Sequence, residues 1–127
     1  MHPRTQANIE RFGLGNRVKA MPKLKILNTL GYIDFLKLVK NSSMAITDSG
    51  GLQEETTFMG VPCLTLRENT ERPITVEKGT NILAGVDPAN ILRELEKVLS
   101  GNLKKGEVPE FWDGRASDRI AAHLLNI

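Results

Sequence analysis

Short apolar runs alternate with amphipathic stretches along most of this sequence. Four runs have the length of short strands, at residues 24–27, 44–47, 62–66 and 81–84. Around them, apolar residues recur at helical spacing, which predicts helices over residues 6–12, 32–40, 52–59, 74–78, 88–99 and 118–125. Apolar strands that alternate with helices favour a parallel sheet covered by helices on both faces. The pattern therefore predicts an α/β fold.

Several predicted helix ends carry residues that start or stop helices. Gly60 and Gly101 each follow a predicted helix, where glycine accepts the left-handed backbone of a C-terminal cap. Asp87 can cap the next helix with its side chain, and Pro88 suits the first helical position. Ser117 is the predicted cap of the last helix.

The stretch TDSGGLQEE, from residue 47 to residue 55, joins a predicted strand to a predicted helix. In an open α/β sheet, ligands bind beyond the carboxyl ends of the strands. Gly50 and Gly51 allow the backbone to approach a ligand closely, and the free N–H groups of the following helix favour an anion. Ser49 adds a hydroxyl donor. We therefore expect a phosphate or diphosphate at this turn.

Two acids, Glu54 and Glu55, follow the turn and admit two interpretations. They can simply favour the positive end of the helix dipole. Alternatively, one of them accepts hydrogen bonds from a sugar diol, which suits the two oxygens of a carboxylate. Helical spacing puts Glu55 one turn beyond Gly51, where the ribose of a nucleoside diphosphate would lie. The spacing alone leaves both interpretations open.

Length, charge and cysteine content exclude several classes of protein. The 127 residues suit one domain, and a net charge of +2 is too small to indicate a nucleic-acid partner. No run approaches the roughly 20 apolar residues of a membrane helix, and the first residues do not resemble a signal peptide. Cys63 is the single cysteine, which excludes an intrachain disulfide and a cysteine-based metal site. We expect a cytoplasmic protein.

Five sequence blocks occur in the order HPRT, LGYIDFL, TDSGGLQEE, RENTERPITVEKGTN and GRASDRI. In this combination and order they resemble the non-hydrolysing UDP-N-acetylglucosamine 2-epimerases. The resemblance covers the C-terminal part of such an enzyme. It implies a GT-B-type fold, with the active site between two Rossmann-like domains and the nucleotide held mainly by the second. Residues 1–127 would then be a single, truncated UDP-binding C-terminal domain without its N-terminal catalytic domain.

The resemblance also implies an activity. Members of this family interconvert UDP-GlcNAc and UDP-ManNAc by eliminating UDP and adding it back from the other face, without a nicotinamide or metal cofactor. They supply precursors for polysaccharide biosynthesis. The acid and base carboxylates and a further catalytic histidine of the family have no counterpart here. We therefore assign no catalytic residue and expect the chain alone to be inactive and to bind UDP or UDP-GlcNAc weakly.

The matched positions predict which residues contact the substrate: Ser49, Gly50 and Gly51 at the diphosphate, Glu55 at the ribose, Phe35 on the uracil, Arg72 near the sugar and phosphates, and His2 at the cleft. Some have an alternative role. Phe35 could be a core residue of its helix. Arg72 could pair with Glu71 or Glu77 at the surface, where such a pair contributes about 0–1 kcal/mol.

Other functions remain possible from the sequence. If the run at 24–27 pairs with the strand at 44–47, it fills the gap that the absent strands leave in the sheet. Otherwise an open edge could recruit a second copy or the missing N-terminal half. The second case favours a non-catalytic sugar-nucleotide-binding or assembly module. The donor domain of a GT-B glycosyltransferase is a further alternative, because such domains also combine a glycine-rich turn with a ribose-binding acid.

Overall fold

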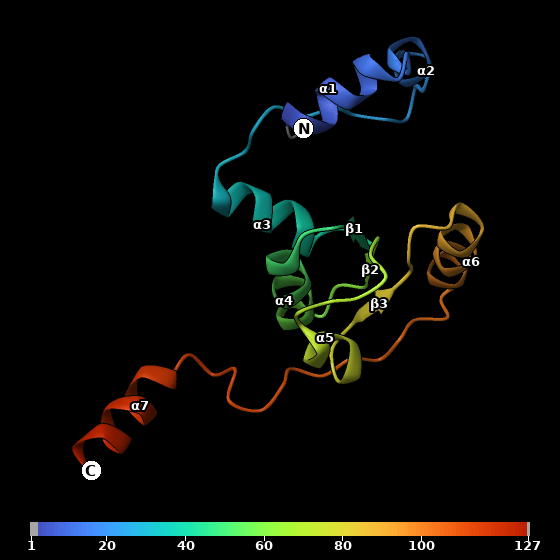
Figure 1. Cartoon of the computed structure of the whole chain (residues 1–127). Helices are drawn as coiled ribbons and strands as arrows, with labels where there is room; N and C mark the ends of the chain where they lie inside the picture. Colours follow the sequence, from blue (N-terminus) through green and yellow to red (C-terminus); the bar gives the residue numbers. More distant parts are fainter. Residues whose placement is uncertain (1–2, 127) are drawn as a thin grey trace. The chain divides into compact units, whose positions relative to one another are not determined.

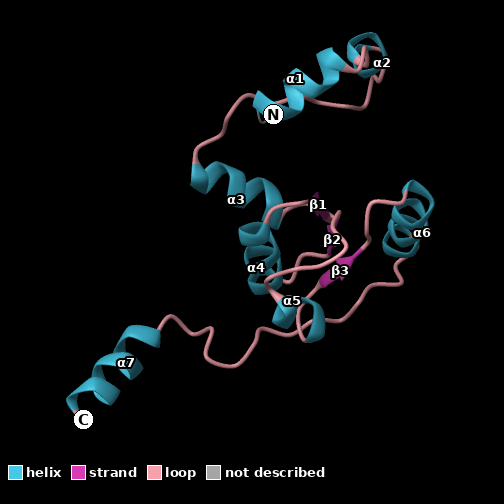
Figure 2. Cartoon of the chain, viewed as in Figure 1, coloured by secondary structure: helices cyan, strands magenta, loops and turns pink. Residues whose placement is uncertain are grey.

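The computed structural model describes residues 3–126, which form two compact units (Figure 1). The boundary between the units falls between residues 37 and 38, within helix α3 (Tyr32–Lys40). Figure 2 shows that helices and loops make up most of the chain and that the strands are short. None of the helices within residues 3–126 is long and apolar enough to cross a membrane.

The first unit contains the helices α1 (Pro3–Arg11) and α2 (Gly15–Lys19). The helix predicted over residues 6–12 is confirmed and begins earlier, and it is followed by Gly13, whose φ of +66° lies in the left-handed region. The sequence did not predict α2. Its five residues, GNRVK, contain one apolar side chain, so they show no helical repeat.

The strand predicted at residues 24–27 is wrong, because this run forms a loop and belongs to no strand of the described sheet. Leu24, Ile26 and Leu27 are 50%, 51% and 44% exposed. A strand needs a neighbouring strand that completes its ladder of backbone hydrogen bonds, and the sheet described within residues 3–126 consists of three other strands. The pairing of 24–27 with the strand at 44–47 is therefore not formed.

The second unit contains a three-stranded parallel sheet in the order β1 (Ala45–Thr47), β2 (Cys63–Thr65), β3 (Asn81–Leu83). Ala45 is in register with Cys63, and Cys63 with Asn81. The predicted parallel α/β sheet is confirmed, with β2 fully buried at its centre. In the described chain β1 is an edge strand, and its Ile46 is 47% exposed.

Helices α4 (Gly50–Met59) and α6 (Pro88–Leu99) lie on opposite sides of the strands (Figure 1). Because side chains alternate along a strand, the two faces differ in chemistry. The face toward α6 is apolar, with Leu64 and Ala84 packed against Val98. The side toward α4 is largely polar: Thr65 and Asn81 of the strands and Gln53, Thr56 and Thr57 of α4 are buried there, together with Thr75 and the small Cys63. The remaining helices are α5 (Pro73–Glu77) and α7 (Ala116–Leu125).

Most predicted helix ends are confirmed. Gly60 ends α4 with φ +71°, and Gly101 follows α6 with φ +83°. The carboxylate of Asp87 accepts a hydrogen bond from the Ala89 amide at 3.2 Å and so caps α6. The predicted cap Ser117 is wrong, because this residue lies inside α7, which begins at Ala116.

Cys63 is expected to resist alkylation in the folded protein. It is fully buried, and burial raises the pKa of its thiol above the usual value of 9.0, although the Thr56 and Thr65 hydroxyls act in the opposite direction. Only the thiolate reacts with iodoacetamide. Mass spectrometry should find little adduct in native buffer and complete labelling in denaturant. Equal labelling rates in both conditions would contradict this burial.

Replacing Asp87 by Ala should destabilise the second unit by about 1 kcal/mol, because the α6 amide loses its side-chain cap. Asp87→Asn retains a capping oxygen and serves as the matched control. Urea unfolding followed by circular dichroism measures both variants. Equal losses for Ala and Asn would show that the carboxylate acts through its charge and not as a cap.

Candidate functional site

The turn between β1 and α4 carries the predicted ligand contacts. The Ser49 amide donates to Thr47 Oγ1 at 3.0 Å, which fixes the path of the chain as it leaves the strand. Ser49 occupies the N-cap of α4 with extended backbone (φ −82°, ψ 131°), but its hydroxyl makes no capping hydrogen bond. The hydroxyl is therefore not committed to the helix and can donate to a ligand.

Helix α4 begins at Gly50, earlier than the predicted start at residue 52. The twin glycines are therefore its first turn, whose N–H groups have no partner within the helix. Gly51 is exposed, and a Cβ placed on it would meet nothing within 4 Å. No side chain covers this part of the turn, so the positive end of α4 is open to an anion.

A carboxylate already lies beside this turn. A Cβ placed on Gly50 would come within 2.7 Å of Glu71 Oε1, so Gly50 permits a close approach of the loop before α5. The other oxygen of Glu71 accepts from Arg67 Nη1 at 2.9 Å. The hydrogen bond from its own backbone N–H, followed by the charge of Arg67, lowers the pKa of Glu71 below 4.5. Glu71 is therefore a negative charge next to the proposed anion site.

Arg72 lies in the same loop and reaches α4. Its Nε is 3.1 Å from Glu54 Oε1, an ion pair in which both side chains are about 40% exposed. The Nε hydrogen itself makes no hydrogen bond, so the attraction is electrostatic only. Arg72 Nη1 also donates to the Glu71 carbonyl at 3.4 Å. Within the described residues the ion pair of Arg72 is with Glu54 and not with Glu71 or Glu77, although the charge of Arg72 also helps to lower the pKa of Glu71.

The remaining predicted residues are placed as follows. Glu55 is partly exposed on α4, and its separation of four residues from Gly51 puts both on one side of the helix. Phe35 is partly buried in α3. His2 lies outside the described residues. The structure thus brings Ser49, the twin glycines and the loop of Arg72 together at one end of α4.

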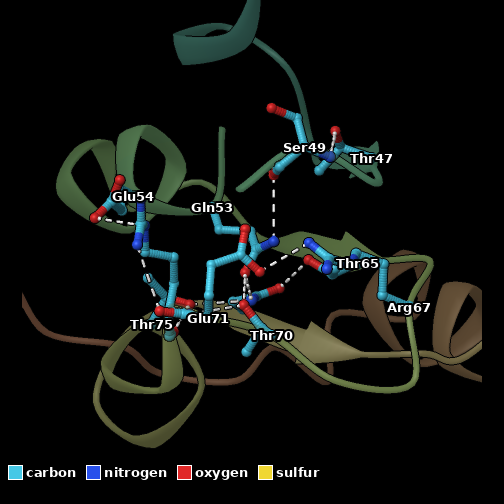
Figure 3. A network of polar contacts seen from close by, with 11 residues as sticks. Thr47, Ser49, Gln53, Glu54, Thr65, Arg67, Thr70, Glu71 and Thr75 are labelled. Atoms are coloured by element: carbon cyan, nitrogen blue, oxygen red, sulfur yellow. Dashed lines mark hydrogen bonds and ion pairs between the residues drawn. The ribbon is translucent and has the colours of Figure 1, made fainter. Parts of the chain in front are cut away.

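Sequence reasoning missed a network of buried polar side chains beneath this site (Figure 3). Its centre is Gln53, which is fully buried on α4. Gln53 lies within the quoted TDSGGLQEE block, but no pattern distinguishes a buried glutamine from an exposed one. The one available signal was the presence of polar residues inside predicted strands and helices: Thr65, Thr75 and Asn81.

Metal-binding groups and hollows are the other features of the described chain that could mark a site. Within residues 3–126, no group of three or more His, Cys, Asp or Glu side chains is placed to hold a metal ion. A hollow of about 500 Å³ lies along α7 and the loop before it, lined in part by Phe111, Asp113 and Arg119. Its charged groups are paired with one another, as Asp113 and Arg119 are at 2.8 Å, and it contains no predicted site residue.

Comparisons with known proteins cover nearly the whole chain. The model of the UDP-N-acetylglucosamine 2-epimerase family matches residues 1–125. A UDP-N-acetylglucosamine 2-epimerase from Methanococcus maripaludis is 53% identical over 102 residues, which are 80% of this chain and 28% of that protein. One from Methanocaldococcus jannaschii is 43% identical over 124 residues, which are 98% of this chain and 33% of that protein.

The fold agrees with these matches. The crystal structure of the Methanocaldococcus jannaschii UDP-GlcNAc 2-epimerase in complex with UDP-GlcNAc and UDP has a TM-score of 0.84 to this chain at 42% identity. The match covers 99% of this chain and 34% of that one, so the chain spans about a third of the length of these relatives. Sequence blocks, fold and glycine turn agree, and the chain belongs to the UDP-N-acetylglucosamine 2-epimerase family.

Proposed function

We propose that this chain is the UDP-binding part of a UDP-N-acetylglucosamine 2-epimerase and holds the diphosphate of UDP-GlcNAc at the first turn of α4. The observation that carries the proposal is the exposed Gly51 turn, where unpaired amides and an uncommitted Ser49 hydroxyl lie together. The resemblance to a structure solved with UDP-GlcNAc and UDP supports the choice of ligand.

Each predicted residue has a distinct task in this proposal. The amides of the first turn and the Ser49 hydroxyl donate to the diphosphate, and Glu55 accepts from the ribose hydroxyls. Arg72, which pairs with Glu54 of the same helix, would add a positive charge at the diphosphate once it leaves that carboxylate. Phe35 would stack on the uracil, and His2 would lie at the cleft.

The same turn would also assist the reaction. Eliminating UDP breaks the bond between the sugar C1 and the β-phosphate oxygen, and negative charge develops on that phosphate. Amides fixed in advance at a helix N-terminus stabilise developing charge without having to reorganise. The proton transfers at C2 need an acid and a base that we do not assign to this chain, so we expect no epimerase activity from it alone.

The chain spans about a third of its relatives. The catalytic groups that it does not supply would come from the N-terminal half of the epimerase, which is the partner we propose, or from a second copy as the alternative. The edge strand β1, with Ile46 half exposed, is where another chain could add to the sheet. This edge also favours the second candidate function, a non-catalytic sugar-nucleotide-binding or assembly module. We also propose a cytoplasmic location for this chain.

Calorimetry with UDP and ADP tests the proposed site. The chain should bind UDP more tightly than ADP. Both nucleotides offer a ribose to Glu55 and a diphosphate to the turn, but only uracil would fit the base site. Ser49→Ala and Glu55→Ala should each weaken UDP binding by about tenfold, the effect of losing one hydrogen bond to a charged group. Ser43→Ala and Glu77→Ala, both exposed and away from the turn, are the matched controls. Identical titrations for both nucleotides and all variants would overturn the proposal.

Removing the negative charge of Glu71 should strengthen diphosphate binding. Glu71→Gln leaves a side chain of the same shape beside Gly50 but removes its repulsion of phosphate and releases Arg67. The gain should appear for UDP and not for uridine, and it should shrink as salt rises. Glu77→Gln is the control. An unchanged or weaker affinity for UDP would mean that the phosphates do not lie near this carboxylate.

A further inference from the structure

The buried face of α4 rests on a layer of polar side chains. Gln53, Thr65, Thr75 and Asn81 all have no exposed surface. Figure 3 shows Gln53 reaching toward Ser49 in one direction and toward the loop that carries Thr70 in the other. The layer lies directly beneath the proposed diphosphate turn, whereas the opposite face of the sheet is packed with apolar residues such as Leu64 and Val98.

Gln53 makes the connection between the turn and the neighbouring loop. Its Nε2 donates to the carbonyl of Ser49 at 3.2 Å. Its Oε1 accepts from the Thr70 hydroxyl at 2.6 Å and from Asn81 Nδ2 at 3.0 Å. One side chain therefore fixes the N-cap residue of α4, the loop before α5 and the start of β3 relative to one another.

Asn81 holds Gln53 in this orientation. Its Nδ2 donates to Gln53 Oε1 and to Thr75 Oγ1, the latter at 3.1 Å, while its Oδ1 accepts from the Thr65 hydroxyl at 2.6 Å. Both amide groups of the network are thus bonded at nitrogen and oxygen, which permits one orientation for each. A buried network that is satisfied in this way is rigid.

The network ends on the backbone of Arg72. The Arg72 amide donates to Thr70 Oγ1 at 3.0 Å, and the Arg72 carbonyl accepts from Thr75 Oγ1 at 2.7 Å. The backbone N–H and C=O of Arg72 are therefore both held by hydroxyls that also bond to Gln53 or Asn81. A continuous path of hydrogen bonds leads from Ser49 through Gln53 and Thr70 to Arg72.

We infer that Gln53 and Asn81 are positioning residues for the nucleotide site: through Thr70 and Thr75 they fix the distance between the diphosphate turn and Arg72. This inference rests on the proposed function of the turn. Apolar side chains pack α6 against the other face of the same sheet, so burial alone did not require polar groups here. Hydrogen bonds have preferred lengths and directions, which apolar packing lacks. The network thus specifies a geometry at the one helix end where geometry matters for a ligand.

Thr70→Val gives the sharpest test, because valine keeps the shape of threonine and removes the hydroxyl that joins Gln53 to Arg72. Thr56→Val is the matched control: Thr56 is buried on α4 too, but its hydroxyl donates to carbonyls of α4 itself, from Leu52 and Gln53. Thr70→Ser should restore the wild-type behaviour. Thr70 is only partly buried, so its variants should fold.

Calorimetry on the full chain gives the dissociation constant of uridine divided by that of UDP. Urea unfolding measures the stability of each variant in parallel. Thr70→Val should lower this ratio by about five- to tenfold with uridine affinity unchanged, because only the phosphate-dependent part of binding needs Arg72 in place. Thr56→Val should lose stability and keep the ratio.

The outcomes separate two failures. If Thr70→Val and Thr56→Val both lose stability and both keep the ratio, the network is purely structural and the inference is overturned while the proposed function stands. If the wild-type chain binds UDP no better than uridine, the proposed function fails first, and the inference fails with it.

Discussion

The site depends on one constraint: the N–H groups in the first turn of α4 cannot be satisfied within the helix. The chain leaves β1 and enters α4 through glycines, so no side chain fills the space in front of those groups at Gly51. The charge of the helix end then favours whatever anion reaches it. In the described structure, the Glu71 carboxylate lies beside the neighbouring Gly50 and pairs with Arg67.

Arginines of the neighbouring loop pair with two of the carboxylates around the turn. Two carboxylates, Glu54 and Glu71, lie close to it, and each is paired with an arginine of the neighbouring loop, Arg72 and Arg67. Both pairs are half exposed, where ion pairs contribute little to stability. Weak pairs of this kind can exchange partners at small cost, and in the proposed function the arginines would do so with a diphosphate. The backbone of Arg72, by contrast, is fixed by two hydroxyls.

The two faces of the sheet contribute to the structure in different ways. Apolar packing of Leu64 and Ala84 against α6 supplies the hydrophobic burial that stabilises the unit. The polar layer under α4 contributes less net free energy for each group buried, but its hydrogen bonds fix the orientation of the side chains and backbone that they join. A fold of this size keeps much of its surface exposed, and the unpaired edge of β1 in the described sheet is consistent with a chain that spans a third of its relatives.

The sequence by itself determined the parallel α/β pattern, the cap at Asp87, the stop at Gly60 and the glycine turn, because each depends on local spacing or backbone freedom. It failed at residues 24–27, since a strand exists only if another strand lies beside it. Only the tertiary structure decided that Arg72 pairs with Glu54 and that Gln53 bridges Ser49 and Thr70. The contacts of Arg72 with Glu54 and of Gln53 with Thr70 join residues far apart in the chain, and no local pattern encodes which polar side chains will meet when a helix packs on a sheet.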